Sequence, residues 1–250
     1  MIPKIIHYCW FGNKIPQNQL EIIENWKELH PDFEFMEWGN ELIVDCKIKF
    51  LKQASRKKQW AFVADYFRLV KVYEFGGYYL DTDMHLIKRI DFFSAKDFVI
   101  CEEDIGRHGW AFFGSIAKNP FLKSCIDKYS NIYFDQFKPP VIPYFLKEIT
   151  LNYLNENNFT VNLTHEYFYP MHFNESKEDF AEFIKDETIG VHLWDFSWGH
   201  NQRNKNIYFE ILYRLKMLII DLFYFDYPLF YFKINYLRIM RLLKQIHIKS

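Results

Sequence analysis

The stretch GGYYLDTDM, residues 76–84, joins two glycines, a short run suited to a β-strand and two aspartates. Residues 59–75, which precede it, have the apolar spacing of a helix, and one of the glycines can end that helix in the left-handed conformation. The run YYL then restarts the chain as a strand. Because residues two apart in an extended chain share one side, we expect Asp81 and Asp83 to point at one place where a buried strand ends.

The composition is that of one folded domain. Of the 250 residues, 50% are hydrophobic and 20% aromatic, which allows a single α/β domain with a well-buried core. The formal net charge of -1 and the absence of arginine-rich runs argue against nucleic acid as a partner. The four cysteines are scattered and the N-terminal apolar run is too short for a secretory signal, so we expect reduced thiols and a cytoplasmic location.

Strand and helix patterns alternate along most of the chain. Residues 5–10 predict a short buried strand, residues 17–29 a helix and residues 32–38 a second strand. DFVICEED, residues 97–104, predicts a further strand with an acidic end, and TIGVHLWDFSW, residues 188–198, predicts a late strand that continues into an aromatic loop. This alternation is typical of an α/β domain with a mainly parallel central sheet.

The two aspartates suggest a metal site. In open α/β sheets, ligands bind beyond the carboxyl ends of the strands, and Asp81 and Asp83 follow such an end. Two carboxylates aimed at one place repel each other unless a cation joins them. Oxygen ligands suit Mg2+ or Mn2+, which leave room for phosphate oxygens. The pair therefore predicts a metal and a phosphate; the structural alternative is an Asp-rich turn after a strand.

Asp65 and Arg68 form a charged pair on the preceding helix. They are three residues apart and share a stripe with Ala61 and Val72, which predicts partial enclosure. One interpretation is an ordinary ion pair worth less than ~1 kcal/mol. The other is a carboxylate that accepts sugar hydroxyls beside a guanidinium that binds hydroxyls or a phosphate.

These motifs together resemble one family of enzymes. AFVADYFRLVKVYEFGGYYLDTDMHLIK, residues 61–88, and the opening IPKIIHYCWFG, residues 2–12, are similar to the DXD-containing glycosyltransferases of family 32, which include yeast initiating mannosyltransferases and bacterial capsule and lipopolysaccharide sugar transferases. The resemblance spans residues 2–118 and resumes at residues 190–198. It implies a GT-A-type α/β fold, a UDP- or GDP-sugar donor, a Mn2+ or Mg2+ ion and retention of the anomeric configuration.

The resemblance also implies roles for individual residues. Asp83 would bind the metal directly, and Asp81 would bridge the donor ribose, the sugar and the metal shell. Asp65 and Arg68 would hold the donor sugar, so that Asp81, Asp83 and Arg68 are the catalytic candidates. His192 would be a third metal ligand, although a lone histidine after a strand is otherwise a core residue.

Aromatic residues at both ends of the motif region are candidates for binding the donor. Tyr8, Trp10 and Phe11 would provide an aromatic face for the base, with burial in the core as the alternative for Trp10. Ser197 and Trp198 would contact the diphosphate. No general base or nucleophile is assigned.

An acidic strand end is open to two interpretations. Glu102, Glu103 and Asp104 end the strand after the DXD motif and either meet an acceptor hydroxyl or form an acidic surface loop.

We therefore predict a retaining, metal-dependent hexosyltransferase that moves a sugar from a nucleotide-diphospho-sugar to a glycan of a capsule, lipopolysaccharide or similar surface polysaccharide. One alternative is a non-catalytic module that binds sugar nucleotides or glycans. Another is a phosphatase with an aspartyl nucleophile, whose motif requires Thr or Val where this chain has His85.

The composition changes at about residue 205. Residues 205–250 are aromatic and helix-compatible, and they hold eight Lys or Arg against three Asp or Glu. We predict a catalytic domain over residues 1–204 and a helical extension over residues 205–250. The extension either lies on the cytoplasmic face of an anionic membrane, which suits a lipid-linked oligosaccharide acceptor, or packs on the core or on a second subunit of a homodimer. Sedimentation with anionic vesicles distinguishes membrane binding from packing on protein.

Overall fold

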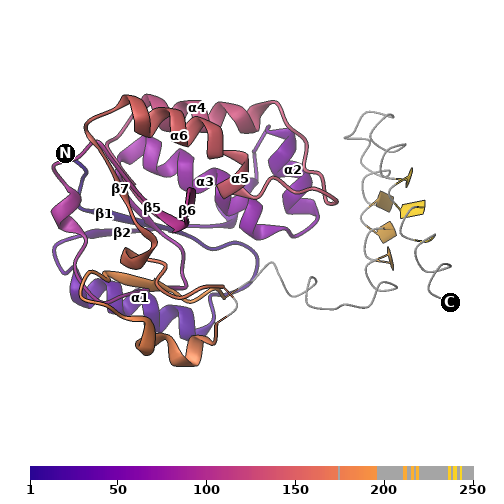
Figure 1. Ribbon diagram of the computed structural model, residues 1–250. Coiled ribbons are helices and arrows are strands. Elements are labelled where there is room, and N and C mark those ends of the chain that lie inside the picture. The colour runs from indigo at the N-terminus through magenta and orange to yellow at the C-terminus, as the bar shows by residue number, and fades with distance from the viewer. Residues whose placement is uncertain are drawn as a thin grey trace.

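A six-stranded sheet forms the centre of the computed structural model (Figure 1). The strand order is β2-β1-β3-β6-β5-β7, where β1 is parallel to β2 and β3, and β5 is parallel to β7. Strand β6 is antiparallel to both of its neighbours. The strands are β1 (Ile5–Cys9), β2 (Glu34–Trp38), β3 (Gly77–Leu80), β5 (Phe98–Asp104), β6 (Arg107–Ser115) and β7 (Thr160–Leu163). A separate antiparallel pair joins β4 (Met84–Leu86) to β8 (Gly190–His192).

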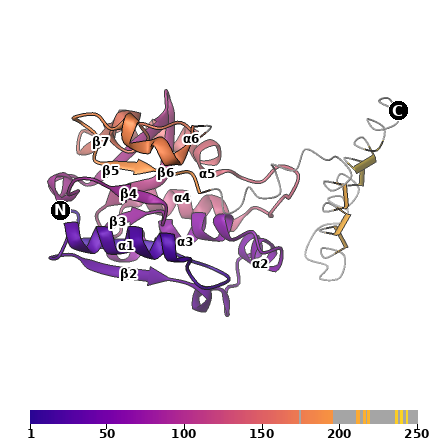
Figure 2. The ribbon, with the colours of Figure 1, turned by 90° about the horizontal axis from the view of Figure 1, so that it is seen from below.

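Helices cover both faces of the sheet, as Figure 1 shows and as Figure 2 shows from the side of α1. The helices are α1 (Gln17–Leu29), α2 (Lys49–Arg56), α3 (Trp60–Phe75), α4 (Pro120–Ser130), α5 (Ile142–Phe145) and α6 (Lys147–Glu156), with short 3-10 turns at Asn40–Ile43, Asp91–Phe93, His165–Tyr167 and Lys177–Phe183. Tyr78 and Leu80 of β3 pack in the core on the α1 side, whereas Tyr79 packs in the core formed with α2, α3 and α4. The predicted α/β fold with a mainly parallel sheet, which the resemblance to GT-A-type transferases implied, is confirmed.

The two glycines of the opening motif connect α3 to β3. Gly76 has φ +70° and Gly77 has φ +106°, so both adopt the left-handed region that favours glycine. A side chain on Gly77 would place its Cβ 2.6 Å from the carbonyl oxygen of Ile5. The predicted glycine cap is therefore confirmed, and the second glycine allows β3 to start in close contact with β1.

The structure describes residues 1–173 and 175–195, and beyond these the helical positions 211, 212, 215, 216, 218, 219, 236, 237, 239, 240 and 243. The predicted boundary near residue 205, most of the predicted extension, and Ser197 and Trp198 lie outside the described residues, so these stay predictions. No helix formed by the described residues has both the length and the apolar character needed to cross a membrane.

Candidate active site

The two aspartates lie in a tight turn directly after β3. The backbone N–H of Asp81 donates to the carbonyl of Ala111 at 2.9 Å, which extends the pairing with β6 by one residue. The N–H of Met84 donates to the carbonyl of Asp81 at 2.9 Å. The sequence predicted that an extended chain would bring the two carboxylates together. A turn does so instead, because β4 begins immediately after Asp83.

His192 completes a cluster of three side chains that can bind a metal. It is the last residue of β8 and lies opposite Met84 in the register with β4. Its Nε2 lies 3.1 Å from Oδ1 of Asp83. One ligand atom each from Asp81, Asp83 and His192 lies within 4.8 Å of the other two. The structure thus brings together the three residues for which the sequence predicted a metal site.

Asp83 and His192 stabilise each other's charged form. Burial alone would raise the pKa of Asp83, but the charge of His192 and hydrogen bonds from His192 and the N–H of Asp195 lower it below its usual value. Burial likewise opposes the charge of His192, and Asp83 outweighs it and raises the pKa of the imidazole. Among the described residues, none forms a hydrogen bond with the buried Nδ1 of His192. Two carboxylates beside a buried imidazole nitrogen are a donor set that fits a divalent cation such as Mn2+ or Mg2+.

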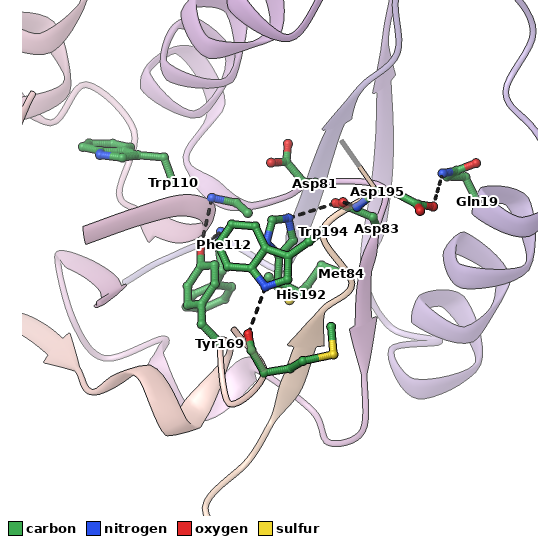
Figure 3. A network of polar contacts seen from close by, with 12 residues as sticks. Gln19, Asp81, Asp83, Met84, Trp110, Phe112, Tyr169, His192, Trp194 and Asp195 are labelled. Atoms are coloured by element: carbon green, nitrogen blue, oxygen red, sulfur yellow. Dashed lines mark hydrogen bonds and ion pairs between the residues drawn. The ribbon is translucent and has the colours of Figure 1, made fainter. Parts of the chain in front are cut away.

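A second set of contacts holds Asp83 from the side of α1. Trp194 has φ +54°, and the next residue, Asp195, donates its backbone N–H to Oδ2 of Asp83 at 2.8 Å. The Asp195 carboxylate accepts a hydrogen bond from Gln19 at 2.9 Å (Figure 3). It accepts another from Asn18 at 3.2 Å. The sequence did not reveal these roles, because a polar residue on an amphipathic helix gives no signal of a partner 176 positions away.

Arg68 connects α3 to the turn that carries Asp81 and Asp83. Its Nη2 lies 2.9 Å from Oδ1 of Asp65 and 3.2 Å from Oδ1 of Asp81. Its Nη1 donates to Oδ2 of Asp81 at 3.3 Å and to the carbonyl of Trp110 at 2.8 Å. The hydroxyl of Tyr79 also donates to Oδ1 of Asp81, at 2.9 Å. The Asp65–Arg68 pair is therefore an enclosed network that includes Asp81, and the interpretation as a solvated surface ion pair is wrong.

Asp65 is the most deeply buried carboxylate of this network. Burial raises its pKa to about 7, and repulsion from Asp81 adds to this effect, although the charge of Arg68 acts in the opposite direction. A carboxyl group that is partly protonated near neutral pH can both donate and accept hydrogen bonds. Such a group suits contacts with the hydroxyls of a sugar.

A cavity of about 570 Å³ lies beside these groups. Its lining includes the predicted residues Trp10, Phe11, Asp65, Arg68, Asp81, Asp83 and His192. It also includes groups that the sequence did not assign to the donor, namely Trp60, Glu103, Arg107, Trp110 and Tyr144.

Tyr8 lies elsewhere. Its ring packs against Trp26 at a centroid distance of 5.8 Å on the α1 side of the sheet, and its hydroxyl donates to Glu37 at 3.2 Å. It is not among the residues that line the cavity, because neighbouring residues of a strand alternate between its two faces. We therefore do not retain its predicted contact with the base.

Comparison with known proteins places the motif region among sugar transferases. Residues 16–104 match the family described as "Glycosyltransferase sugar-binding region containing DXD motif". Inositol phosphoceramide mannosyltransferase 3 of Schizosaccharomyces pombe is 34% identical over 94 residues, which are 36% of this chain and 26% of that relative. Inositol phosphoceramide mannosyltransferase 1 of the same yeast is 25% identical over 240 residues, which are 88% of this chain and 73% of that protein.

A likeness among solved structures is more distant. A glycosyltransferase involved in the glycosylation of the major capsid of PBCV-1 is 14% identical, with a TM-score of 0.44 over 84% of this chain and 100% of that one. The similarity predicted from residues 61–88 is confirmed by the match over residues 16–104. Residues 16–104 of the chain are thus similar to the DXD-containing sugar-binding region of glycosyltransferases.

Proposed function

We propose that the protein is a retaining hexosyltransferase that uses a divalent cation to move a sugar from a UDP- or GDP-sugar to an acceptor hydroxyl. The observation that carries the proposal is the convergence of Asp81, Asp83 and His192 at one cavity. The names of the yeast relatives favour mannose as the donor sugar and a lipid headgroup as one acceptor class. Surface polysaccharides are the other acceptor class, and retention rests on the family resemblance.

The site residues fit the requirements of this reaction. A cation held by Asp81, Asp83 and His192 would supply positive charge for the departing diphosphate. Arg68 fixes Asp81 through both carboxylate oxygens, so that this side chain is oriented before any ligand arrives. Asp65 contacts the guanidinium of Arg68 and lines the cavity, so it can exchange hydrogen bonds with sugar hydroxyls.

The phosphatase alternative does not agree with these contacts. An aspartyl nucleophile needs a free carboxylate oxygen at the first position of the motif. Here Oδ1 of Asp81 accepts from Tyr79 and lies 3.2 Å from Arg68, and Oδ2 accepts from Arg68. The first aspartate is thus held as a positioned ligand.

A panel of UDP- and GDP-sugars, incubated with and without Mn2+, tests the proposal. We expect one donor, with GDP-mannose as the first candidate, to release nucleoside diphosphate only when Mn2+ is present. The Asp83→Ala variant should fold and lose this release, because a charge-stabilising ligand is gone. Nucleotide binding without turnover of any sugar would instead favour the binding module, and normal turnover by well-folded Asp83→Ala would contradict the metal assignment.

A further inference from the structure

The far side of the cavity is formed by the hairpin of β5 and β6. Strand β5 is parallel to β7, and β6 is antiparallel to β3, so the end of β5 and the start of β6 lie at the same sheet edge as Asp81. In the order β2-β1-β3-β6-β5-β7, strand β1 lies on one side of β3 and this hairpin lies on the other. Trp10 and Phe11, which follow β1, therefore line the opposite side of the cavity from Glu103 and Arg107.

A β-bulge directs Glu103 into this cavity. Glu102 pairs with His108 and Asp104 pairs with Arg107, so Glu103 is the extra residue between two pairs. Bulges of this kind reorient a side chain and are common next to active sites. Glu103 lines the cavity and lies close enough to His192 for their charges to interact, whereas Glu102 is not a lining residue.

Arg107 fixes the Glu103 carboxylate and leaves part of it available. Nε of Arg107 donates to Oε1 of Glu103 at 2.6 Å, and its Nη1 donates to the hydroxyl of Tyr144 at 2.9 Å. Its Nη2 lies 3.4 Å from Asp104. Within the described ranges, no group donates a hydrogen bond to Oε2 of Glu103.

The charge and shape of this side indicate the class of ligand. Glu103 matches the positive charge of Arg107, and Asp104 lies 3.4 Å from Arg107 without lining the cavity, so this side offers no unpaired positive charge to a phosphate. Residues 141–144 add the side chains of Val141, Ile142, Pro143 and the ring of Tyr144, which is 63% exposed. An aromatic ring beside a carboxylate suits the face and the hydroxyls of a neutral polyol.

We propose that Glu103, Arg107 and Tyr144 form the acceptor subsite and that Oε2 of Glu103 accepts a hydrogen bond from a hydroxyl of an uncharged polyol, a sugar or a cyclitol. The inference rests on the proposed function, because it takes the side of β1 and Asp83 as the donor side. The inference adds to the proposed function the location of the acceptor subsite. It also adds that this subsite prefers a ring that carries no phosphate where the ring meets Glu103.

Binding of small polyols to the protein loaded with Mn2+ and GDP tests the inference. The probes are methyl α-mannoside and myo-inositol, each compared with its phosphorylated form, mannose 6-phosphate or inositol 1-phosphate, and binding is followed by titration calorimetry. We expect the neutral probes to bind more tightly than the phosphates. Glu103→Ala should lower the affinity for a neutral probe by about ten- to hundredfold, which is the loss typical of one hydrogen bond to a charged group.

Glu102→Ala is the matched control, since it removes the same charge one residue away from the cavity. It should leave polyol binding unchanged, and both variants should bind Mn2+ and GDP like the parent protein. Equal polyol affinity in the parent protein and Glu103→Ala, or tighter binding of the phosphates, would overturn the acceptor assignment. If the parent protein did not bind GDP or UDP in the presence of Mn2+, that result would instead contradict the proposed function itself.

Discussion

Arg68 is the residue on which the proposed donor side of the site depends. Its guanidinium is buried, interacts with Asp65 and Asp81, donates to the carbonyl of Trp110 and lies 4.6 Å from the ring centroid of Tyr79. The i, i+3 spacing predicted the contact with Asp65. The contact with Trp110 could not be predicted, because residues 110–112 have no partners in the register between β5 and β6, and no sequence pattern marked that irregularity.

Arg68→Lys should destabilise the protein strongly. A lysine has one ammonium group in place of the planar fork, so it cannot satisfy two carboxylates and a carbonyl together. We expect the free energy of unfolding, measured by urea denaturation at pH 7.5, to fall by about 2 kcal/mol or more. Arg89→Lys is the matched control, because Arg89 pairs with Asp32 and Asp91 while its side chain is 37% exposed. That change should destabilise the protein less than Arg68→Lys, because solvent screens an exposed ion pair, and equal losses in the two variants would contradict the role given to Arg68.

At the scale of elements, the alternation of strand and helix patterns predicted β1, α1, β2, α3, β3 and β5, whose apolar periods are clear. The antiparallel direction of β6 was not predicted, since an apolar run does not reveal strand direction. A signal was nevertheless present. Only Ile105 and Gly106 separate Asp104 from Arg107, and Gly106 has φ +68°. A two-residue link that contains glycine is typical of a β-hairpin, and this hairpin is what brings Glu103 to the cavity.

His7 of β1 connects three elements and makes their packing dependent on pH. Trp38 of β2 donates its Nε1–H to Nδ1 of His7 at 3.1 Å, so the proton of the neutral ring is on Nε2, which donates to the carbonyl of Gly76 at 2.7 Å. Burial, together with the charge of Lys71, lowers the pKa of His7 to about 4, although the bond to Gly76 acts in the opposite direction. The unfolded chain therefore binds a proton below pH 6.5 that the folded chain does not bind until about pH 4.

The free energy of unfolding should fall as the pH is lowered, because the imidazole of His7 is held neutral in the fold. The contribution of His7 is complete above pH 6.5 and is lost as the pH falls to about 4, at a rate of up to about 1.4 kcal/mol per pH unit. His7→Gln removes the titrating group. Between pH 6.5 and about 4, the slope of the unfolding free energy against pH should therefore become shallower, by the equivalent of up to about one bound proton. His165→Gln, at a side chain that is 38% exposed, is the control. An unchanged slope in His7→Gln would show that the histidine is not held neutral in the fold.

At the scale of the whole molecule, the sheet arranges the proposed functions along one edge. Aromatic residues after β1, the turn with Asp81 and Asp83 after β3, and the β5–β6 hairpin line the same cavity in the order of the strands. The sequence predicted Asp81, Asp83 and Arg68 because their spacing is local. It proposed His192 only through the family resemblance, since 109 residues separate it from Asp83, and it missed Asp195 because only the fold brings that residue to Asp83.

Calorimetric titration of GDP and UDP, in the presence and absence of Mn2+, tests the metal site most directly. We predict that Mn2+ raises the affinity of the preferred nucleotide at least about tenfold, because a cation held by Asp81 and Asp83 would supply positive charge to the diphosphate. Asp83→Asn should abolish this gain in a folded protein, whereas Asp127→Asn, at an exposed ion pair on α4, should retain it. Equal nucleotide affinity with and without Mn2+ in the parent protein, or an undiminished gain in Asp83→Asn, would contradict the proposed metal site.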